Sequence, residues 1–248
     1  MTIRRVRNDD STCAAMCVVG TAAGPLPGDD ISLEITALAN ARVRVCYAGA
    51  SVAQGSGGPP ARLRTSVTAG EDASVIGSNP PLVVAAGAAV DSQVSFDLAP
   101  TATLEWSELL VLGRSGEQAG AVRWSWNAVV GGRALLRQTV VLDRIGAPLA
   151  LAGARLVAST LLLAPDLAAQ TVVLHERAVA ARLADTALLL TVLGADAASV
   201  SHDLARLRAL CIRTAPEGSF VASGPAPGRW AAAERDREPV TAKSKDNQ

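Results

Sequence analysis

Aromatic residues and histidines are scarce in this chain of 248 residues. Phe, Trp and Tyr make up 3% of it, and its two histidines are His175 and His202. So few aromatic side chains argue against a stacking platform for single-stranded nucleic acid. The 23 basic and 23 acidic residues balance, so no net charge attracts nucleic acid or an anionic membrane. We therefore expect neither nucleic acid nor a membrane as a partner.

Long apolar runs are also missing. The most apolar stretch, LALAGARLVASTLLLA from Leu149, is interrupted by Arg155 and is too short to span a bilayer. The first ten residues, MTIRRVRNDD, lack the apolar segment of a signal peptide. These features predict a cytoplasmic protein.

The motifs of common enzymes are absent as well. No serine stands in G-x-S-x-G, and the phosphate-binding and dinucleotide-binding glycine motifs are missing. A catalytic triad would need His175 or His202, and nothing in the sequence pairs either with a nucleophile. We interpret both histidines as structural or solvent-exposed, and we expect no enzymatic activity and no tightly bound cofactor.

Four cysteines are too few and too scattered for a familiar metal motif. They are Cys13, Cys17, Cys46 and Cys211. The C-x-x-x-C spacing of Cys13 and Cys17 matches neither a zinc ribbon nor a thioredoxin motif. We interpret the cysteines mainly as small buried apolar residues, with a transient metal-binding pair at Cys13 and Cys17 as the alternative.

Alternation of apolar and polar residues dominates the first two-thirds of the chain and predicts β-strands from about Ala14 to Thr191. It is clearest in three segments, whose apolar positions are Ile31, Leu33 and Ile35; Val43, Val45 and Tyr47; and Val122, Trp124 and Trp126. Trp124 and Trp126 share one predicted face and should be buried. Gly131-Gly132 then separates two such runs, which is typical of a tight hairpin.

A weak internal repeat recurs roughly every 30 residues. It consists of a strand, a turn and a strand, with an alanine after the turn, and its copies are ITALANARV from Ile35, VTAGEDASV from Val67 and FDLAPTATL from Phe96. Such units cannot bury a face alone, so they usually stack in layers. Chance similarity in an alanine-rich chain is the alternative.

Helices are predicted only towards the C-terminus. The segment from about Asp196 to Leu210 carries Val200, Leu204 and Leu207 at helical spacing, with Asp196 placed to cap it. The segment ERAVAARLAD, from Glu176, is rich in helix-forming residues and predicts a second, shorter helix. TALLLTVLG, between them, predicts a buried strand that ends at Gly194. The polar end of the chain should be disordered, and residues after about Pro227 should be dispensable.

Four carboxylates at predicted strand ends are the candidate metal ligands. Asp29 and Asp30 follow GPLPG, and Glu105 and Glu108 flank Trp106. Turn formation is the alternative role for the two aspartates. For the two glutamates, the alternatives are an exposed strand face and an internal salt bridge. Oxygen ligands of this kind would hold a divalent cation only weakly.

Five segments, in order, resemble the UreD (also called UreH) family of urease accessory proteins. They are AAGPLPGDDISLEI from Ala22, FDLAPTATLEWSELLVLGRSGE from Phe96, RALLRQTVVLD from Arg133, ARLVASTLLLAP from Ala154 and TALLLTVLGADAASVSHDLARLRAL from Thr186. The resemblance covers about residues 22–210. SVIGSNPPLVVAAGA, from Ser74, and the loop SVAQGSGGPPA, from Ser51, depart from the family pattern.

The resemblance implies an all-β fold, a right-handed superhelix of stacked β-strands with one or two helices near the C-terminus. Together with the polar composition of the C-terminal end, it predicts one domain over residues 1–224 and a disordered polar tail over 225–248. It further implies a scaffold that binds UreF and, through it, the GTPase UreG, docks on apo-urease and passes nickel through a water-filled route. Asp29, Asp30 and Glu108 fall on positions that match the family pattern, whereas Glu105 does not. A non-enzymatic β-solenoid or sandwich binding module unrelated to urease is the alternative.

Overall fold

The computed structural model describes residues 1–7 and 10–212, and the predicted polar tail lies outside this range. Strands dominate, with 53% of the residues in strands and 10% in helices. The strands are β1 Thr2–Arg5, β2 Ala14–Val19, β3 Asp30–Ala37, β4 Arg42–Tyr47, β5 Ser51–Ala53, β6 Ala61–Ala69, β7 Ser74–Ser78, β8 Leu82–Val84, β9 Ala89–Leu98, β10 Thr103–Leu112, β11 Ala121–Val130, β12 Arg133–Leu142, β13 Leu156–Leu163, β14 Val172–His175, β15 Ala178–Ala184 and β16 Ala187–Gly194. The helices are α1, Gly146–Ala150, and α2, Ala197–Ile212.

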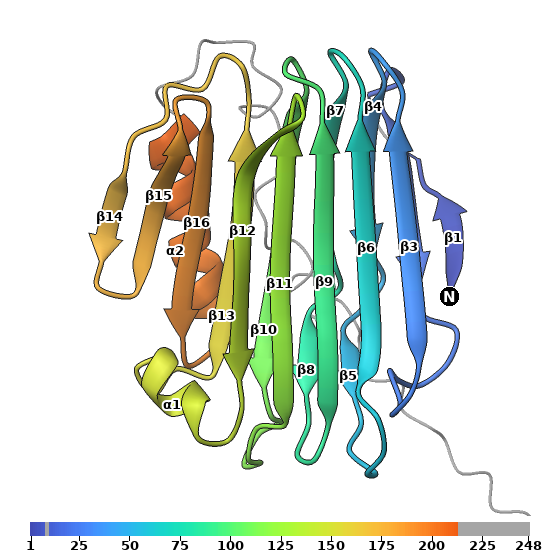
Figure 1. Ribbon diagram of the computed structural model, residues 1–248, viewed down its shortest axis with the longest axis vertical. Helices are drawn as coiled ribbons and strands as arrows, with labels where there is room; N and C mark the ends of the chain where they lie inside the picture. Colours follow the sequence, from blue (N-terminus) through green and yellow to red (C-terminus); the bar gives the residue numbers. More distant parts are fainter. Residues whose placement is uncertain (8–9, 213–248) are drawn as a thin grey trace, which may run out of the picture.

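Two sheets lie face to face (Figure 1). The front sheet has five strands in the order β12-β11-β9-β6-β3. The rear sheet has eleven strands in the order β1-β2-β4-β7-β10-β13-β16-β15-β14, with β5 and β8 attached beside β10. Alternating apolar side chains from both sheets meet between them and form the main core.

The predicted repeat is confirmed as the winding unit of the fold. Its first positions, Ile35, Val67 and Phe96, are register partners on β3, β6 and β9 of the front sheet. Its last positions, Val43, Val75 and Leu104, are register partners on β4, β7 and β10 of the rear sheet. The chain therefore crosses from the front sheet to the rear sheet once per repeat, and the result is a β-solenoid of about four turns.

The repeat alanine sits where the chain enters the rear sheet. Ala73 and Ala102 are 1% and 0% exposed, and the ladder continues through them, since Ser74 N donates to Ala41 O and Thr103 N to Ala73 O, each over 2.8 Å. A larger side chain would have no space at these stacked positions.

Two other predictions near the middle of the chain are confirmed. β11 and β12 pair antiparallel across Gly131-Gly132, and both glycines have positive φ, as a tight hairpin turn requires. Trp124 and Trp126 are buried, and Trp126 packs against Phe96 with ring centroids 5.8 Å apart.

The C-terminal helix α2 is confirmed, and it covers the outer face of the rear sheet (Figure 1). Val200, Leu204 and Leu207 are buried in a second core with residues of β13, β15 and β16. Asp196 caps the helix, because its Oδ1 accepts the Ser199 N–H at 2.9 Å. No helix in the described part of the chain has both the length and the apolarity to cross a membrane.

The second predicted helix, from Glu176, is wrong. Glu176 and Arg177 form the turn between β14 and β15, and the following residues continue as β15, paired with β16. Ala178 and Ala180 are 1% and 0% exposed and face α2 in the second core. Pairing and burial outweigh the helix propensity of this alanine-rich segment.

Candidate functional site

A cavity of about 460 Å³ lies between the two sheets, next to the first turns of the solenoid. Two neighbouring coils of the rear sheet are interrupted at the same height. β4 ends before residues 48–50 and resumes as β5, and β7 ends before Asn79-Pro80-Pro81 and resumes as β8. Proline supplies no ladder N–H, so the Pro-Pro step forces the second interruption. Both interrupted segments line the cavity.

Glu108 is the buried acidic residue of this cavity. It lies on β10 beside the interruption, and 6% of it is exposed. Asn79 donates an N–H to Oε1, and the Trp124 indole N–H donates to Oε2 at 2.5 Å. Glu108 thus links the rear sheet to Trp124 on the front sheet.

Burial raises the pKa of Glu108 to about 7, although the hydrogen bonds from Asn79 and Trp124 lower it. Near neutral pH the carboxyl group therefore exchanges between its neutral and ionised forms. A cation in the cavity would favour the ionised form, since an opposite charge lowers the pKa of a carboxyl group.

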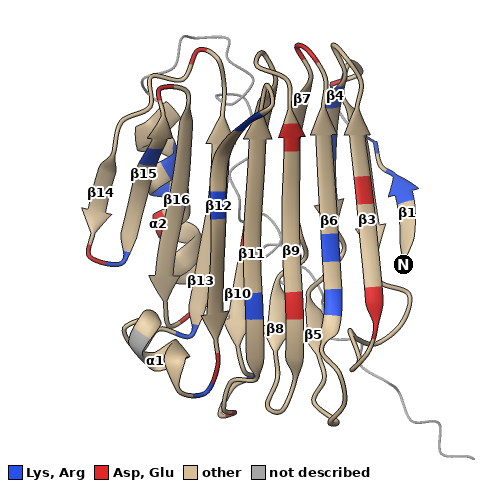
Figure 2. Cartoon of the chain, viewed as in Figure 1, with Lys and Arg blue, Asp and Glu red and all other residues tan. Residues whose placement is uncertain are grey.

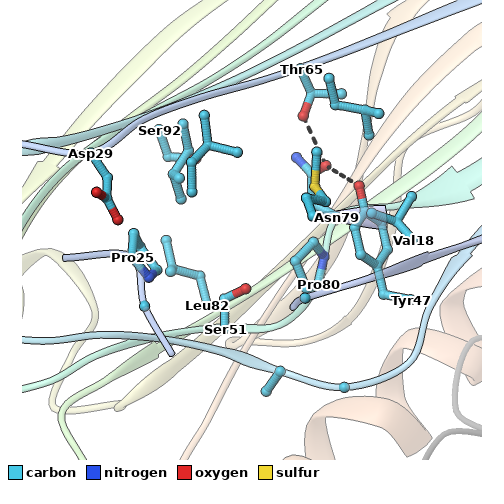
Figure 3. A pocket seen from close by; sticks show the side chains of 18 of the residues that line it. Val18, Pro25, Asp29, Tyr47, Ser51, Thr65, Asn79, Pro80, Leu82 and Ser92 are labelled. Atoms are coloured by element: carbon cyan, nitrogen blue, oxygen red, sulfur yellow. Dashed lines mark hydrogen bonds between the residues drawn. The ribbon is translucent and has the colours of Figure 1, made fainter. Parts of the chain in front are cut away.

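Asn79 connects Glu108 to two hydroxyl groups. Its contacts with Tyr47 and Thr65 are shown in Figure 3. Its Oδ1 accepts the Tyr47 hydroxyl at 3.2 Å and the Thr65 hydroxyl at 3.0 Å, while its Nδ2 donates to Glu108. Burial raises the pKa of Tyr47 above its ordinary value, and the nearby Glu108 charge adds to this effect. Tyr47 therefore stays neutral and remains a donor at neutral pH, so the orientation of the Asn79 amide is fixed.

Asp29 and Asp30, the two aspartates predicted as metal ligands, lie in different environments. Asp29 lines the cavity, but its Oδ2 also accepts the Leu26 N–H at 2.8 Å, so the predicted turn role is present too. In Figure 3 Asp29 lies at one side of the view and Asn79, with Tyr47, at the other. Asp29 and Glu108 share the cavity without sharing a hydrogen-bond partner.

Asp30 lies outside the cavity lining. Its carboxylate pairs with Arg64, and the two side chains are 45% and 47% exposed. It begins a row of alternating charges, Asp30, Arg62, Asp91 and Arg123, which are register partners on the outer face of the front sheet (Figure 2). Such a row stabilises strand pairing, so the observed environment of Asp30 is structural.

Glu105 is not part of the cavity either. It lies three residues before Glu108 on the same strand, and side chains alternate between faces, so the two glutamates point in opposite directions. Glu105 is buried under α2 and paired with Arg208. Of the alternatives for this residue, the internal salt bridge is the one observed.

The described residues contain no group of three or more His, Cys, Asp or Glu side chains placed to hold a metal ion.

The prediction that the cysteines are buried apolar residues holds for only some of them, since Cys13 is buried and Cys46 is exposed. His175 Nε2 lies 3.0 Å from Asp203 Oδ2 and joins the β14–β15 turn to α2, which fits a structural role. The cavity thus offers one buried and one half-buried carboxylate with hydroxyl and amide oxygens, a set suited to weak cation binding.

Sequence reasoning missed Asn79, Tyr47, Thr65 and Trp124 as parts of this site. The Pro-Pro step after Asn79 was a usable signal, because it marks a break in a strand. Tyr47 was a second signal, as the chain's single tyrosine. Thr65 and Trp124 carried no signal in the local sequence.

Comparison with known proteins agrees with this architecture. The family model described as UreD urease accessory protein matches residues 1–222. The chain belongs to the UreD family. The family predicted from the sequence is thereby confirmed, and the alternative of a binding module unrelated to urease is wrong.

The matches to individual UreD proteins cover different shares of this chain and of the relatives. The urease accessory protein UreD of Streptomyces avermitilis is 32% identical over 209 residues, which cover 79% of this chain and 81% of the relative. The urease accessory protein UreD 1 of Streptomyces griseus is 37% identical over 121 residues, 49% of this chain. That match spans about half, 48%, of the S. griseus protein.

Proposed function

We propose that this chain acts in urease maturation as a non-catalytic scaffold and as a conduit for nickel on its way into apo-urease. Nickel is cargo in this proposal and not a resident cofactor. Membership of the UreD family supports the link to urease. The observation that carries the conduit is the cavity between the two sheets, with Glu108 buried in its wall.

The ligand chemistry of the cavity fits transit better than storage. A path must bind an ion favourably enough for entry and weakly enough for exit. Several imidazoles or thiolates would hold nickel more firmly than carboxylates and neutral oxygens. Asp29 and Glu108, with the Tyr47 and Thr65 hydroxyls and the Asn79 amide, supply oxygen ligands only.

The proposed partners follow from the family. UreF binds this chain, the GTPase UreG joins through UreF, and the assembly docks on apo-urease in the cytoplasm. A chain that supplies a passage and a docking surface needs no nucleophile and no nucleotide-binding loop.

Urease activation tests the proposal. The full chain is expressed with its urease and accessory proteins, and urease activity is measured per apo-urease at limiting nickel. We expect Glu108→Gln and Asp29→Asn each to lower activation several-fold, and the double variant to lower it further. Full activation by the double variant would exclude these carboxylates from the route.

Glu34→Gln is the matched control, because Glu34 is an exposed carboxylate on β3, outside the cavity lining. It should leave activation unchanged, as should Asp30→Asn if Asp30 acts only on the outer face. Calorimetry of the isolated chain adds a second measurement. Stoichiometric nickel binding with sub-micromolar affinity would contradict a weak transit site.

A further inference from the structure

Cys17 and Cys46 stand side by side in the rear sheet, although they are far apart in the sequence. β2 and β4 pair in parallel, and their register places Cys17 directly opposite Cys46. Adjacent strands lie about 4.8 Å apart, which brings the two side chains within reach of each other. The predicted Cys13–Cys17 pair is much less favourable, because four residues along an extended strand span roughly 13 Å.

Both thiols lie on the outer face of the rear sheet. Their strand neighbours Val18 and Val45 point into the core between the sheets, so Cys17 and Cys46 point away from it. Cys46 is exposed, Cys17 is half-buried, and neither forms a disulfide. Each thiol donates a weak hydrogen bond to a backbone oxygen, Cys46 to Met16 O at 3.5 Å and Cys17 to Val18 O at 3.9 Å.

Two arginines flank the thiol pair. Arg4 of β1 is the register partner of Cys17, and Arg44 lies two residues before Cys46 on the same face of β4. Burial, followed by contact with the Cys17 thiol, raises the pKa of Cys46 to about 11, and the Arg44 charge opposes this shift. The register of β2 and β4 is the observation that places the two thiol side chains next to each other. The guanidinium groups would stabilise an anionic thiolate complex.

We propose that Cys17 and Cys46 form a two-thiolate binding site for copper(I) on the outer face of the rear sheet. Thiolates select soft cations such as copper(I). The described residues bring no third His, Cys, Asp or Glu to this pair, which disfavours zinc, because structural zinc sites hold four ligands. Two sulfur ligands suit a cation of low coordination number.

The binding step conserves oxidation state. Each S–H bond breaks, its proton passes to water, and each sulfur forms a bond to copper, which stays copper(I). One cation and two thiolates give a complex with a net charge of minus one, which Arg4 and Arg44 flank. Two protons leave on binding, so affinity rises with pH.

Competition for copper(I) tests the site. The reduced full-length chain is titrated, without oxygen, into the coloured copper(I) complex of bicinchoninate. The wild-type chain should withdraw a single equivalent of copper(I), and Cys17→Ser and Cys46→Ser should each abolish this withdrawal. Cys13→Ser and Cys211→Ser are the matched controls and should retain it, with circular dichroism verifying the fold of every variant.

Several results would overturn the site. The proposal is wrong if the wild-type chain withdraws no copper(I), or if Cys46→Ser withdraws as much as the wild-type chain. It is also wrong if a folded Cys13→Ser variant withdraws none. Formation of a Cys17–Cys46 disulfide without copper binding by the reduced chain would also overturn it. The site is separate from the cavity carboxylates, so this test and the urease activation test fail independently.

Discussion

Arg208 of α2 holds Glu105 of β10 in a two-point ion pair, with Nε 2.7 Å from Oε1 and Nη2 2.8 Å from Oε2. The two side chains are 10% and 5% exposed. The pair therefore ties the C-terminal helix to a strand in the middle of the rear sheet. It satisfies two charges that would be costly to bury alone.

Removing one partner of this pair should destabilise the fold strongly. Arg208→Gln leaves the Glu105 carboxylate buried without its counter-ion, and we expect the free energy of unfolding to fall by about 3–5 kcal/mol. Denaturant unfolding followed by circular dichroism measures this change. Arg206→Gln, on the exposed face of the same helix, should change stability by no more than about 0.5 kcal/mol. Equal stability of the two variants would show that the ion pair contributes little.

The buried carboxyl of Glu108 should make stability depend on pH. Its pKa in the folded chain is about 7, above the 4.5 of an unperturbed glutamate. Between these pH values the folded chain holds a proton that the unfolded chain has released. The free energy of unfolding therefore falls as pH rises through this window and levels off above about 7.

Glu108→Gln removes this titration. As the pH rises from 4.5 to 8, the wild-type chain should lose unfolding free energy relative to the variant, by on the order of 3 kcal/mol. Denaturant titrations of both proteins at several pH values give this difference, and the contributions of other groups cancel. Parallel pH profiles would contradict a raised pKa at Glu108.

Asn79→Ala should move the same window to higher pH. The Asn79 amide lowers the pKa of Glu108 by donating to it, so its loss should raise that pKa above about 7. The pH dependence of unfolding free energy again reports the shift. Asn127→Ala, on the outer face of β11, is the control, and it should leave the midpoint of the pH dependence at its wild-type value. An unchanged midpoint in Asn79→Ala would mean that this hydrogen bond has little influence.

Gly77 allows close packing of Trp106, so Gly77→Ala should destabilise the core. A Cβ atom at this position would lie 2.8 Å from Trp106 Cε3 and closer still to Cζ3. Trp106 is fully buried and packs edge-on against Phe96, so the ring has little freedom to move. We expect a loss of roughly 1–3 kcal/mol in unfolding free energy. Gly20→Ala has open space around its Cβ position and should be close to neutral. A neutral Gly77→Ala would show that the ring can move after all.

Several parts of the fold follow from local sequence. The alternation around Leu33, Val45 and Trp124 fixes which side chains face the core, because a strand repeats every two residues. The repeat beginning at Ile35 and Val67 predicts the stacking, and its positions prove to be register partners. The cap at Asp196 and the Gly131-Gly132 hairpin depend on backbone geometry that a few adjacent residues determine.

The helix predicted from Glu176 shows where local information is insufficient. Ala178 and Ala180 favour a helix by propensity, yet they lie on a strand because small side chains fit beneath α2. What decides the outcome is the pairing of β15 with β16 and the burial against the helix, neither of which is encoded within ten residues.

The sequence by itself determined the strand-rich fold, the core-facing positions, the C-terminal helix and the family. Only the tertiary structure decided which carboxylates share a cavity, because Glu108 depends on Asn79 and Trp124, and Glu105 on Arg208, which is 103 residues away. It also decided that Cys17 lies beside Cys46. The physical reason is that periodicity acts within one strand, whereas partners are set by register between coils of the solenoid and by packing between its sheets.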